Sequence, residues 1–150
     1  MNAQKLMKLE IVTVPPELPV EAAHQIMLNR GLRHLPVVAD QKLAGIVSDR
    51  DILLVSGKSP RGAFVYPALT VGEVMTLAPI TASPDASVAE LARVMVENKI
   101  DALPVLTSQN VLVGLVTSTD LMLLLTELPE QAQPALSFQI RRAADLTARA

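Results

Sequence analysis

The stretch LPVVADQKLAGIVSDRDIL, residues 35–53, returns as LPVLTSQNVLVGLVTSTDLM, residues 103–122. The register extends upstream, where Met7 falls on Met75, 68 positions later; one extra residue near Val111 shifts the later pairs to 69. A unit that repeats at this scale usually cannot bury its apolar face alone. Two copies therefore predict one pseudo-symmetric domain, with equivalent clefts between its halves where a ligand can sit.

Composition narrows the function classes. The chain has 150 residues, half of them apolar, which is enough for one domain with a sizeable core. Its formal charge of −2 lacks the basic excess of nucleic-acid-binding proteins, and the absence of cysteine excludes disulfides and thiolate metal sites. The N-terminus has no signal-peptide core, and no apolar run approaches the roughly 20 residues that span a bilayer. We therefore expect a cytoplasmic protein that binds neither nucleic acid nor membrane.

Each copy predicts the same elements in the order β-α-β-β-α. These are a short extended run, a helix with apolar residues 3.6 apart, the two strands of a hairpin, and a short closing helix. The expected residues are 11–14, 20–31, 35–39, 43–48 and 51–55, and then 80–82, 88–100, 103–107, 112–117 and 120–125. Strands that alternate with helices indicate an α/β (α+β-like) fold, in which helices pack on one face of a mixed sheet.

The domain boundaries follow from the repeat. We expect residues 7–55 to form the first unit and residues 71–125 the second. The Gly-, Pro- and Ser-rich residues 56–70 between them read as a linking surface loop. Residues 126–150 form a C-terminal extension of moderate helix propensity, which we expect to pack as a helix on the domain or on a second subunit.

Both copies place a hydroxyl and an aspartate three residues apart at the start of the closing helix: Ser48 with Asp51, and Thr117 with Asp120. Helix N-termini attract anions, and a carboxylate that accepts two hydrogen bonds suits a ribose diol, so the pair predicts a nucleotide site. The same spacing is also produced by helix capping without any ligand, and that alternative stays open.

A glycine lies inside the strand that precedes each of these motifs, Gly45 in the first copy and Gly114 in the second. Glycine weakens a strand unless a backbone or a ligand has to approach closely. The two glycines therefore predict a close approach at equivalent points of both copies.

A Pro-Val strand, a Gly-aliphatic-Val-Ser/Thr strand and an Asp three positions after the hydroxyl, all present twice, resemble the CBS (cystathionine-β-synthase) domain in its tandem pair, the Bateman module. The similarity covers residues 7–125 and is to small stand-alone bacterial CBS-domain proteins. It implies two β-α-β-β-α repeats packed with pseudo-two-fold symmetry, a homodimer, and a regulatory or sensor role. The implied ligand is AMP, ADP or ATP, and Mg²⁺ would accompany ATP. The resemblance does not identify a protein partner that the module regulates.

The resemblance also implies which positions touch the ligand: the first extended run and the backbone before the Pro-Val strand embrace adenine, and the Asp holds the ribose. One cleft would use Thr13, Val14, Leu32, Ser48 and Asp51, and the other Thr81, Ala82, Ile100, Thr117 and Asp120. The phosphate positions are Arg33, His34 and Arg50 in the first copy and Asp101, Ala102 and Thr119 in the second. This difference in charge predicts two unequal clefts.

Other function classes compete with nucleotide sensing. A ligand-free CBS pair that dimerises and docks on a partner is one alternative, favoured by the leucines of residues 52–54 and 121–125, and an S-adenosylmethionine binder is another. An enzyme is disfavoured because Ser48, His34 and Asp51 lack the G-x-S-x-G context of a hydrolase nucleophile. Two histidines and no cysteine also make a metal site unexpected.

Overall fold

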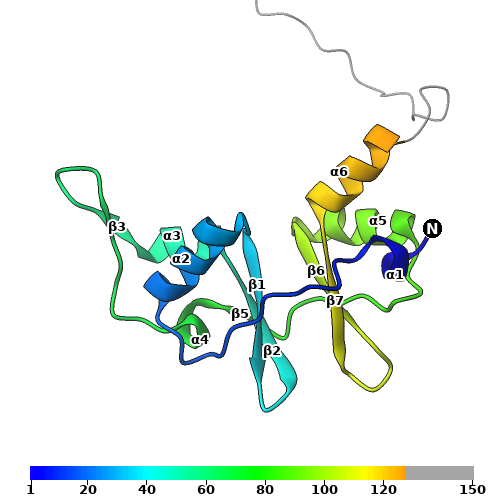
Figure 1. Ribbon diagram of the computed structural model, residues 1–150, viewed down its shortest axis with the longest axis horizontal. Helices are drawn as coiled ribbons and strands as arrows, with labels where there is room; N and C mark the ends of the chain where they lie inside the picture. Colours follow the sequence, from blue (N-terminus) through cyan, green and yellow to red (C-terminus); the bar gives the residue numbers. More distant parts are fainter. Residues whose placement is uncertain (128–150) are drawn as a thin grey trace, which may run out of the picture.

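Two β-hairpins form the centres of two halves that lie side by side in the computed structural model, which describes residues 1–127 (Figure 1). In chain order the elements are α1 (Ala3–Leu6), α2 (Val20–Arg30), β1 (His34–Ala39), β2 (Lys42–Ser48), α3 (Asp49–Val55), β3 (Gly57–Lys58), β4 (Phe64–Val65), α4 (Val71–Val74), β5 (Thr76–Leu77), α5 (Val88–Asn98), β6 (Ala102–Leu106), β7 (Leu112–Thr117) and α6 (Ser118–Glu127). The predicted α/β architecture of two related β-α-β-β-α units is confirmed.

The two hairpins have the same register. β1 pairs antiparallel with β2, with Pro36 opposite Ile46, and β6 pairs with β7, with Pro104 opposite Leu115. Each ladder shifts by one residue near the turn that joins its strands, at equivalent positions. The polar turns predicted between the strands lie where the sequence placed them, because their residues tolerate the left-handed backbone, as Asn110 does with a φ of 61°.

The long helix of each half ends at a residue with a left-handed backbone, and the second of these helices also begins at a capping hydroxyl. Gly31 ends α2 with a left-handed φ of 64°, and Lys99 takes the same role after α5 with a φ of 54°. The Ser87 hydroxyl caps α5 by accepting a hydrogen bond of 3.2 Å from the backbone N–H of Glu90. These signals are local in the sequence, and the predicted helix positions are confirmed.

The N-terminal segment of each repeat packs on the other repeat. The backbone N–H of Ala3, in α1, donates to the Ala86 carbonyl at 2.8 Å, and that of Val71, in α4, donates to Leu18 at 2.8 Å. Figure 1 shows α1, at the N-terminus, beside α5 in the second half. The first core contains Val14, Val20, Ala23, Met27, Leu35, Val37, Val47, Ile52 and Val71, and the second Ala3, Leu91, Met95, Leu103, Val105 and Val116. The packed halves therefore differ from the sequence units 7–55 and 71–125.

Strand pairing follows the same exchange. Lys8 bridges antiparallel to Leu115 in β7, and Thr76 in β5 pairs with Ile46 in β2. Since residue 76 is the repeat equivalent of residue 8, the two halves trade one short strand segment each. We call the exchanged pieces, residues 1–9 and 70–77, the swapped segments.

The close approach predicted at the two strand glycines comes from the swapped segments. A Cβ on Gly45 would lie 2.6 Å from the Met75 sulfur and 2.6 Å from the Thr76 carbonyl oxygen. A Cβ on Gly114 would lie 2.7 Å from Cγ of Met7. The neighbour is therefore a methionine of the opposite repeat, which leaves no room for a ligand at either glycine.

Two further expectations meet a different structure. Residues 11–14 and 80–82 form no strand and contribute only single parallel bridges, Val14 to Val37 and Ala82 to Val105. The expected loop 56–70 contains the β3–β4 hairpin. The predicted helix of the C-terminal extension lies almost wholly outside the described residues. No helix in the described part of the chain is long and apolar enough to cross a membrane.

Candidate ligand-binding clefts

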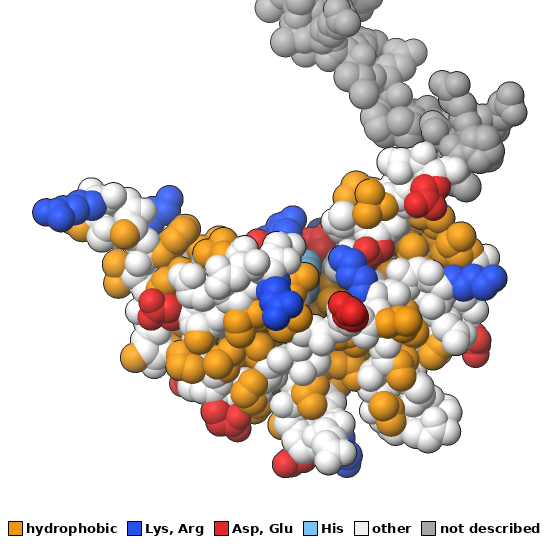
Figure 2. Space-filling view, in the orientation of Figure 1, with side chains coloured by type: hydrophobic (Ala, Val, Ile, Leu, Met, Phe, Trp, Pro, Cys, Tyr) orange, Lys and Arg blue, Asp and Glu red, His pale blue; other side chains and the backbone are white. Residues whose placement is uncertain are grey.

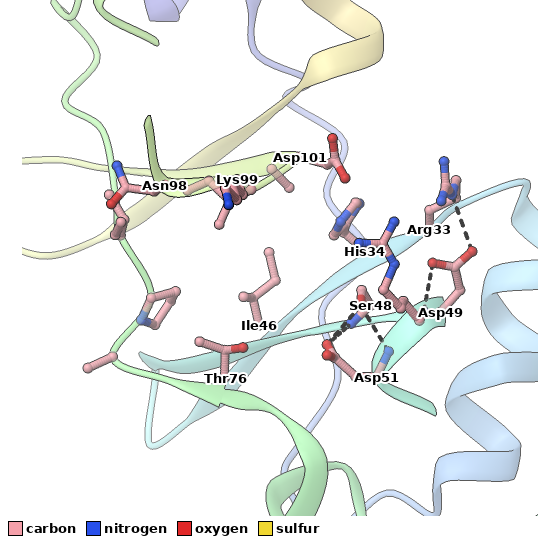
Figure 3. A pocket seen from close by; sticks show the side chains of 16 residues that line it. Arg33, His34, Ile46, Ser48, Asp49, Asp51, Thr76, Asn98, Lys99 and Asp101 are labelled. Atoms are coloured by element: carbon pink, nitrogen blue, oxygen red, sulfur yellow. Dashed lines mark hydrogen bonds and ion pairs between the residues drawn. The ribbon is translucent and has the colours of Figure 1, made fainter. Parts of the chain in front are cut away.

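Two clefts open where the halves meet, and both contain polar side chains. The first cleft has a volume of about 350 Å³ and is shown in Figure 3. Its lining residues are Arg33, His34, Ile46, Ser48, Asp49, Arg50, Asp51, Thr76, Ala78, Pro79, Ile80, Asn98, Lys99, Ile100, Asp101 and Ala102. The second cleft, of about 140 Å³, is lined by Lys8, Glu10, Ile11, Val12, Gly31, Leu32, Arg33, His34, Asp101, Leu115, Thr117, Ser118 and Thr119. Only the first lies within the roughly 300–1,000 Å³ typical of small-molecule sites.

Each cleft draws residues from both repeats, which the expected grouping did not anticipate. Ser48 and Asp51 share the first cleft with Ile100, and Thr117 shares the second with Leu32. This mixing arises because the clefts lie where the two halves meet, and the swapped segments add Thr76 to the first cleft and Lys8 to the second. The remaining expected contacts line neither cleft; these are Thr13, Val14, Thr81, Ala82 and Asp120.

The Ser48–Asp51 pair caps α3 and also faces the first cleft. Asp51 Oδ2 accepts hydrogen bonds from the Ser48 backbone N–H and hydroxyl, both at 2.8 Å, and the Asp51 N–H donates to the Ser48 hydroxyl oxygen at 3.1 Å. The capping role weighed from the sequence is therefore present. Within residues 1–127 no hydrogen bond or ion pair engages the other carboxylate oxygen, Oδ1, so capping leaves one acceptor available to a ligand.

The Thr117–Asp120 pair repeats this geometry with one addition. Asp120 Oδ2 accepts from the Thr117 N–H at 2.7 Å and from its hydroxyl at 2.6 Å. Its Oδ1, however, lies 3.4 Å from the ammonium of Lys8, which comes from the first swapped segment. Both carboxylate oxygens of Asp120 are therefore engaged within the protein. The residue is 7% exposed and lines neither cleft.

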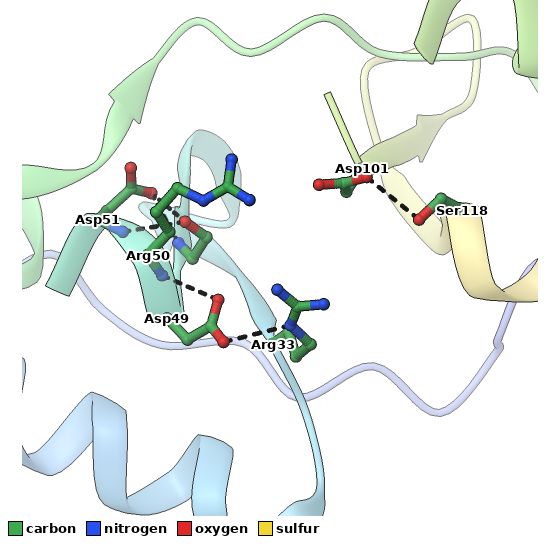
Figure 4. Close-up of polar contacts among 7 residues, drawn as sticks. Arg33, Asp49, Arg50, Asp51, Asp101 and Ser118 are labelled. Atoms are coloured by element: carbon green, nitrogen blue, oxygen red, sulfur yellow. Dashed lines mark hydrogen bonds and ion pairs between the residues drawn. The ribbon is translucent and has the colours of Figure 1, made fainter. Parts of the chain in front are cut away.

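Charged side chains of the two halves face one another across the first cleft (Figures 2 and 4). Arg33 Nε lies 3.2 Å from Asp49 Oδ2, and Asp49 Oδ1 accepts the Arg50 N–H at 2.8 Å. At the equivalent place of the second repeat, the Ser118 hydroxyl donates to Asp101 at 3.3 Å. The first repeat therefore carries two guanidinium groups where the second carries a carboxylate and a threonine.

His34 lies at the boundary and lines both clefts. Burial lowers the pKa of its imidazole below the usual 6.5, because the charged ring would lose its hydration. Asp101, Asp49 and Asp51 oppose this shift in the pKa, and Arg33 adds to it. The lowered pKa favours the neutral ring at pH 7, and a negative group placed beside the ring would raise that pKa.

Sequence reasoning missed two lysines at the clefts. Lys99 lines the first cleft at the helix end where the first repeat has Gly31, and Lys8 lines the second where the first cleft has Thr76. The repeat register pairs both sets of positions, but only the exchange of segments reveals which cleft each residue enters. No cluster of three or more potential metal ligands occurs in the part of the chain that the structure covers.

Comparison with known sequences gives one family. A family model described as CBS domain matches residues 3–58 and 71–127. An inosine-5′-monophosphate dehydrogenase of Korarchaeum cryptofilum is 35% identical over 119 residues, 79% of this chain, but this chain spans only 23% of that enzyme's length. The CBS domain-containing protein YhcV of Bacillus subtilis is 30% identical over 120 residues, 80% of this chain and 82% of that protein.

Solved structures agree with the sequence comparison. The CBS domain pair of protein MJ0100, in complex with 5′-methylthioadenosine and S-adenosyl-L-methionine, is similar with a TM-score of 0.71 and 26% identity, over 84% of this chain and 96% of that one. The cytosolic domain of the Mg²⁺ channel MgtE in complex with ATP is similar with a TM-score of 0.66 and 26% identity, over 82% and 48%. The paired hairpins, the duplicated cleft motifs and both family matches lead to one conclusion: the chain belongs to the CBS domain family and carries two copies of the domain.

Proposed function

We propose that the protein is a regulatory sensor that binds an adenine nucleotide, AMP, ADP or ATP, in its first cleft. One observation carries the proposal: Asp51 presents an unengaged carboxylate oxygen in the same 350 Å³ cleft as the cations Arg33, Arg50 and Lys99. A carboxylate suits a ribose diol, and a group of cations suits phosphates. The complexes of MJ0100 and MgtE named above hold adenosine-containing ligands, which supports the same class.

The proposed pose uses the three chemical surfaces of the first cleft. The ribose hydroxyls donate to Asp51 Oδ1, and the adenine lies against the aliphatic side chains of Ile46, Ile80 and Ile100. The phosphates lie toward the cations, with Lys99 reaching in from the second repeat. Because such a ligand touches both halves, its binding changes the free energy of their association, which is the physical basis of a regulatory signal. The role is sensing rather than catalysis, and the proposed location is the cytoplasm, where these nucleotides are abundant.

The proposal is tested by thermal shift and calorimetry of the full chain with AMP, ADP, ATP, adenosine, S-adenosylmethionine and, as a control, GMP. We expect micromolar to sub-millimolar affinity for an adenine nucleotide, corresponding to roughly −5 to −8 kcal/mol. A ligand that binds only the folded state at a hundred times its Kd adds about 2.7 kcal/mol of stability, which raises the melting temperature measurably. If the protein prefers S-adenosylmethionine to every phosphate ligand, S-adenosylmethionine replaces the adenine nucleotide as the proposed ligand. If it responds to no adenosine compound, the ligand-free docking module becomes the favoured function.

Exposed apolar side chains on the closing helices support a second part of the proposal, a homodimer. Leu54 on α3 is 77% exposed, and Met122 and Leu123 on α6 are 57% and 56% exposed. Apolar groups gathered on equivalent helices favour burial against a second copy. Sedimentation at micromolar concentration should give twice the 16.1 kDa chain mass, and a monomer throughout that range would remove this part of the proposal.

A further inference from the structure

Residues 8 and 76 occupy the same position in the two halves. Lys8 bridges to Leu115 in β7 as Thr76 pairs with Ile46 in β2, and these partners are themselves repeat equivalents. Lys8 lines the second cleft and Thr76 the first. Figure 3 shows Thr76 along the same side of the first cleft as Asp51. The side chain at this position therefore enters the cleft in both halves, and only its chemistry differs.

The two aspartates differ accordingly. Beside the second cleft the ammonium of Lys8 lies 3.4 Å from Asp120 Oδ1, while the N–H and the hydroxyl of Thr117 donate to Oδ2. In the first cleft a threonine replaces the lysine, and no ion pair joins Asp51 anywhere in residues 1–127. A lysine ammonium is a charged donor with three N–H groups. By pairing with Asp120 Oδ1, it satisfies the carboxylate oxygen to which a ribose diol would otherwise donate.

Space and exposure point in the same direction. Asp120 is 7% exposed and contributes to neither cleft, whereas Asp51 is only partly buried and lines the first. The second cleft has about 140 Å³ against about 350 Å³ in the first. A ligand entering the second cleft would have to displace the lysine and reopen the access to the carboxylate.

We propose that Lys8 is an internal occupant of the second cleft: it holds Asp120 in an ion pair, so that each chain binds one ribose-containing ligand, in the first cleft. This inference rests on the proposed nucleotide function. The Lys8 side chain is 52% exposed, so the packing of the first swapped segment does not require a lysine there. The inference gives this side chain the role of holding Asp120. The single residue at position 8 or 76 then decides which cleft is open.

The test exchanges these two residues and counts sites by calorimetry of the full chain with AMP. Lys8→Thr gives the second cleft the threonine of the first, in which Asp51 has no ion pair. Thr76→Lys gives the first cleft the lysine of the second. Lys5→Thr is the matched control, since it removes the same charge from the same segment and Lys5 lines neither cleft. Circular dichroism establishes that each variant is folded.

We expect one AMP per chain in the parent protein and in Lys5→Thr, and two in Lys8→Thr. The second site in Lys8→Thr should be lost in Lys8→Thr/Asp120→Ala and kept in Lys8→Thr/Asp51→Ala. Thr76→Lys should weaken the first site by at least about tenfold, because the new ammonium competes for Asp51.

Two results would overturn the inference while leaving the proposed function intact. The first is two AMP per parent chain, each lost with its own aspartate. The second is weaker binding in Lys8→Thr, which would make Lys8 a phosphate ligand. A parent and a Lys8→Thr variant that both ignore AMP would instead refute the nucleotide function, and the inference with it.

Discussion

The two clefts are built on equivalent backbone and differ at several side-chain positions, at four of which only one copy carries a cation. These four pairs of repeat-equivalent positions are Arg33 and Asp101, which both line both clefts, and Arg50 and Thr119, Thr76 and Lys8, and Lys99 and Gly31, whose first members line the first cleft and whose second members line the second. The hairpin register and the hydroxyl–aspartate pair at the start of the closing helix are the same in both. The scaffold therefore supplies two places for a ligand, and a few side chains decide what each place can hold.

The largest difference between the clefts is expected at their aspartates. Asp51→Ala should reduce AMP affinity by about a hundredfold or more, since two charge-assisted hydrogen bonds to the ribose contribute on the order of 1.5–3 kcal/mol each. Asp120→Ala should leave AMP affinity unchanged. Both changes remove a helix cap and should lower the free energy of unfolding by similar amounts, about 1 kcal/mol. Calorimetry and urea titration measure the two effects, and equal losses of AMP affinity would erase the distinction between the clefts.

The strand glycines test the features that the halves share. Gly45→Ala and Gly114→Ala should each lower the free energy of unfolding by about 1–3 kcal/mol, because the new methyl group meets Met75 or Met7. Gly57→Ala is the control, since its nearest neighbour would be 4.0 Å away and its backbone is unstrained. Thermal unfolding of the three variants makes the comparison. If Gly114→Ala does not lower the free energy of unfolding, the Met7 side chain can move away from the new methyl group, and the first swapped segment packs less tightly than the second.

Phosphate recognition should separate the clefts by a smaller amount. Arg50→Ala should weaken AMP by about tenfold, or 1.4 kcal/mol, and leave adenosine nearly unchanged, since only the phosphate gains from the guanidinium. Thr119→Ala, at the equivalent position, is the matched control and should change neither affinity. Parallel calorimetric titrations with both ligands provide the measurement. An equal loss for AMP and adenosine would mean that Arg50 holds the cleft in shape.

The smallest expected effect concerns protons at the boundary residue His34. Its pKa lies below 6.5 in the ligand-free protein because of burial, and a phosphate beside the ring raises it, so binding takes up protons. AMP affinity should therefore rise a few-fold as the pH falls from 7.5 to 6. In the same range the ligand-free protein loses some stability, since the unfolded chain takes up that proton more readily.

Calorimetry in two buffers of different ionisation enthalpy measures the proton uptake. His34→Gln provides the reference, because the titration of the AMP phosphate itself is the same in both proteins. Identical proton uptake in the parent and in His34→Gln would remove His34 from the phosphate site.

The sequence predicted what is local and missed what depends on the exchange. Gly31 and Ser87 fixed helix ends, and the hairpins followed from alternating apolar strands around polar turns, since such signals act over a few residues. Gly45 and Gly114 predicted that some group approaches the strand closely, but no local sequence pattern identifies that group as Met75 or Met7. In the same way the adenine and ribose positions of each repeat were assigned to one cleft, although the packing of the halves places Ile100 with Ser48 and Leu32 with Thr117.

The exchanged segments also govern how the chain folds. Neither core is complete until a segment from the other repeat arrives, because Val71 is part of the first core and Ala3 part of the second. A ribosome must therefore release residues up to about α4 before even the first core can close, and contacts of such long sequence separation form slowly. Because each core contains a segment of the other repeat, we expect the two halves to unfold in a single cooperative transition rather than in two. A chain cut between the repeats would leave two fragments that must find each other, and their reassembly would depend on concentration.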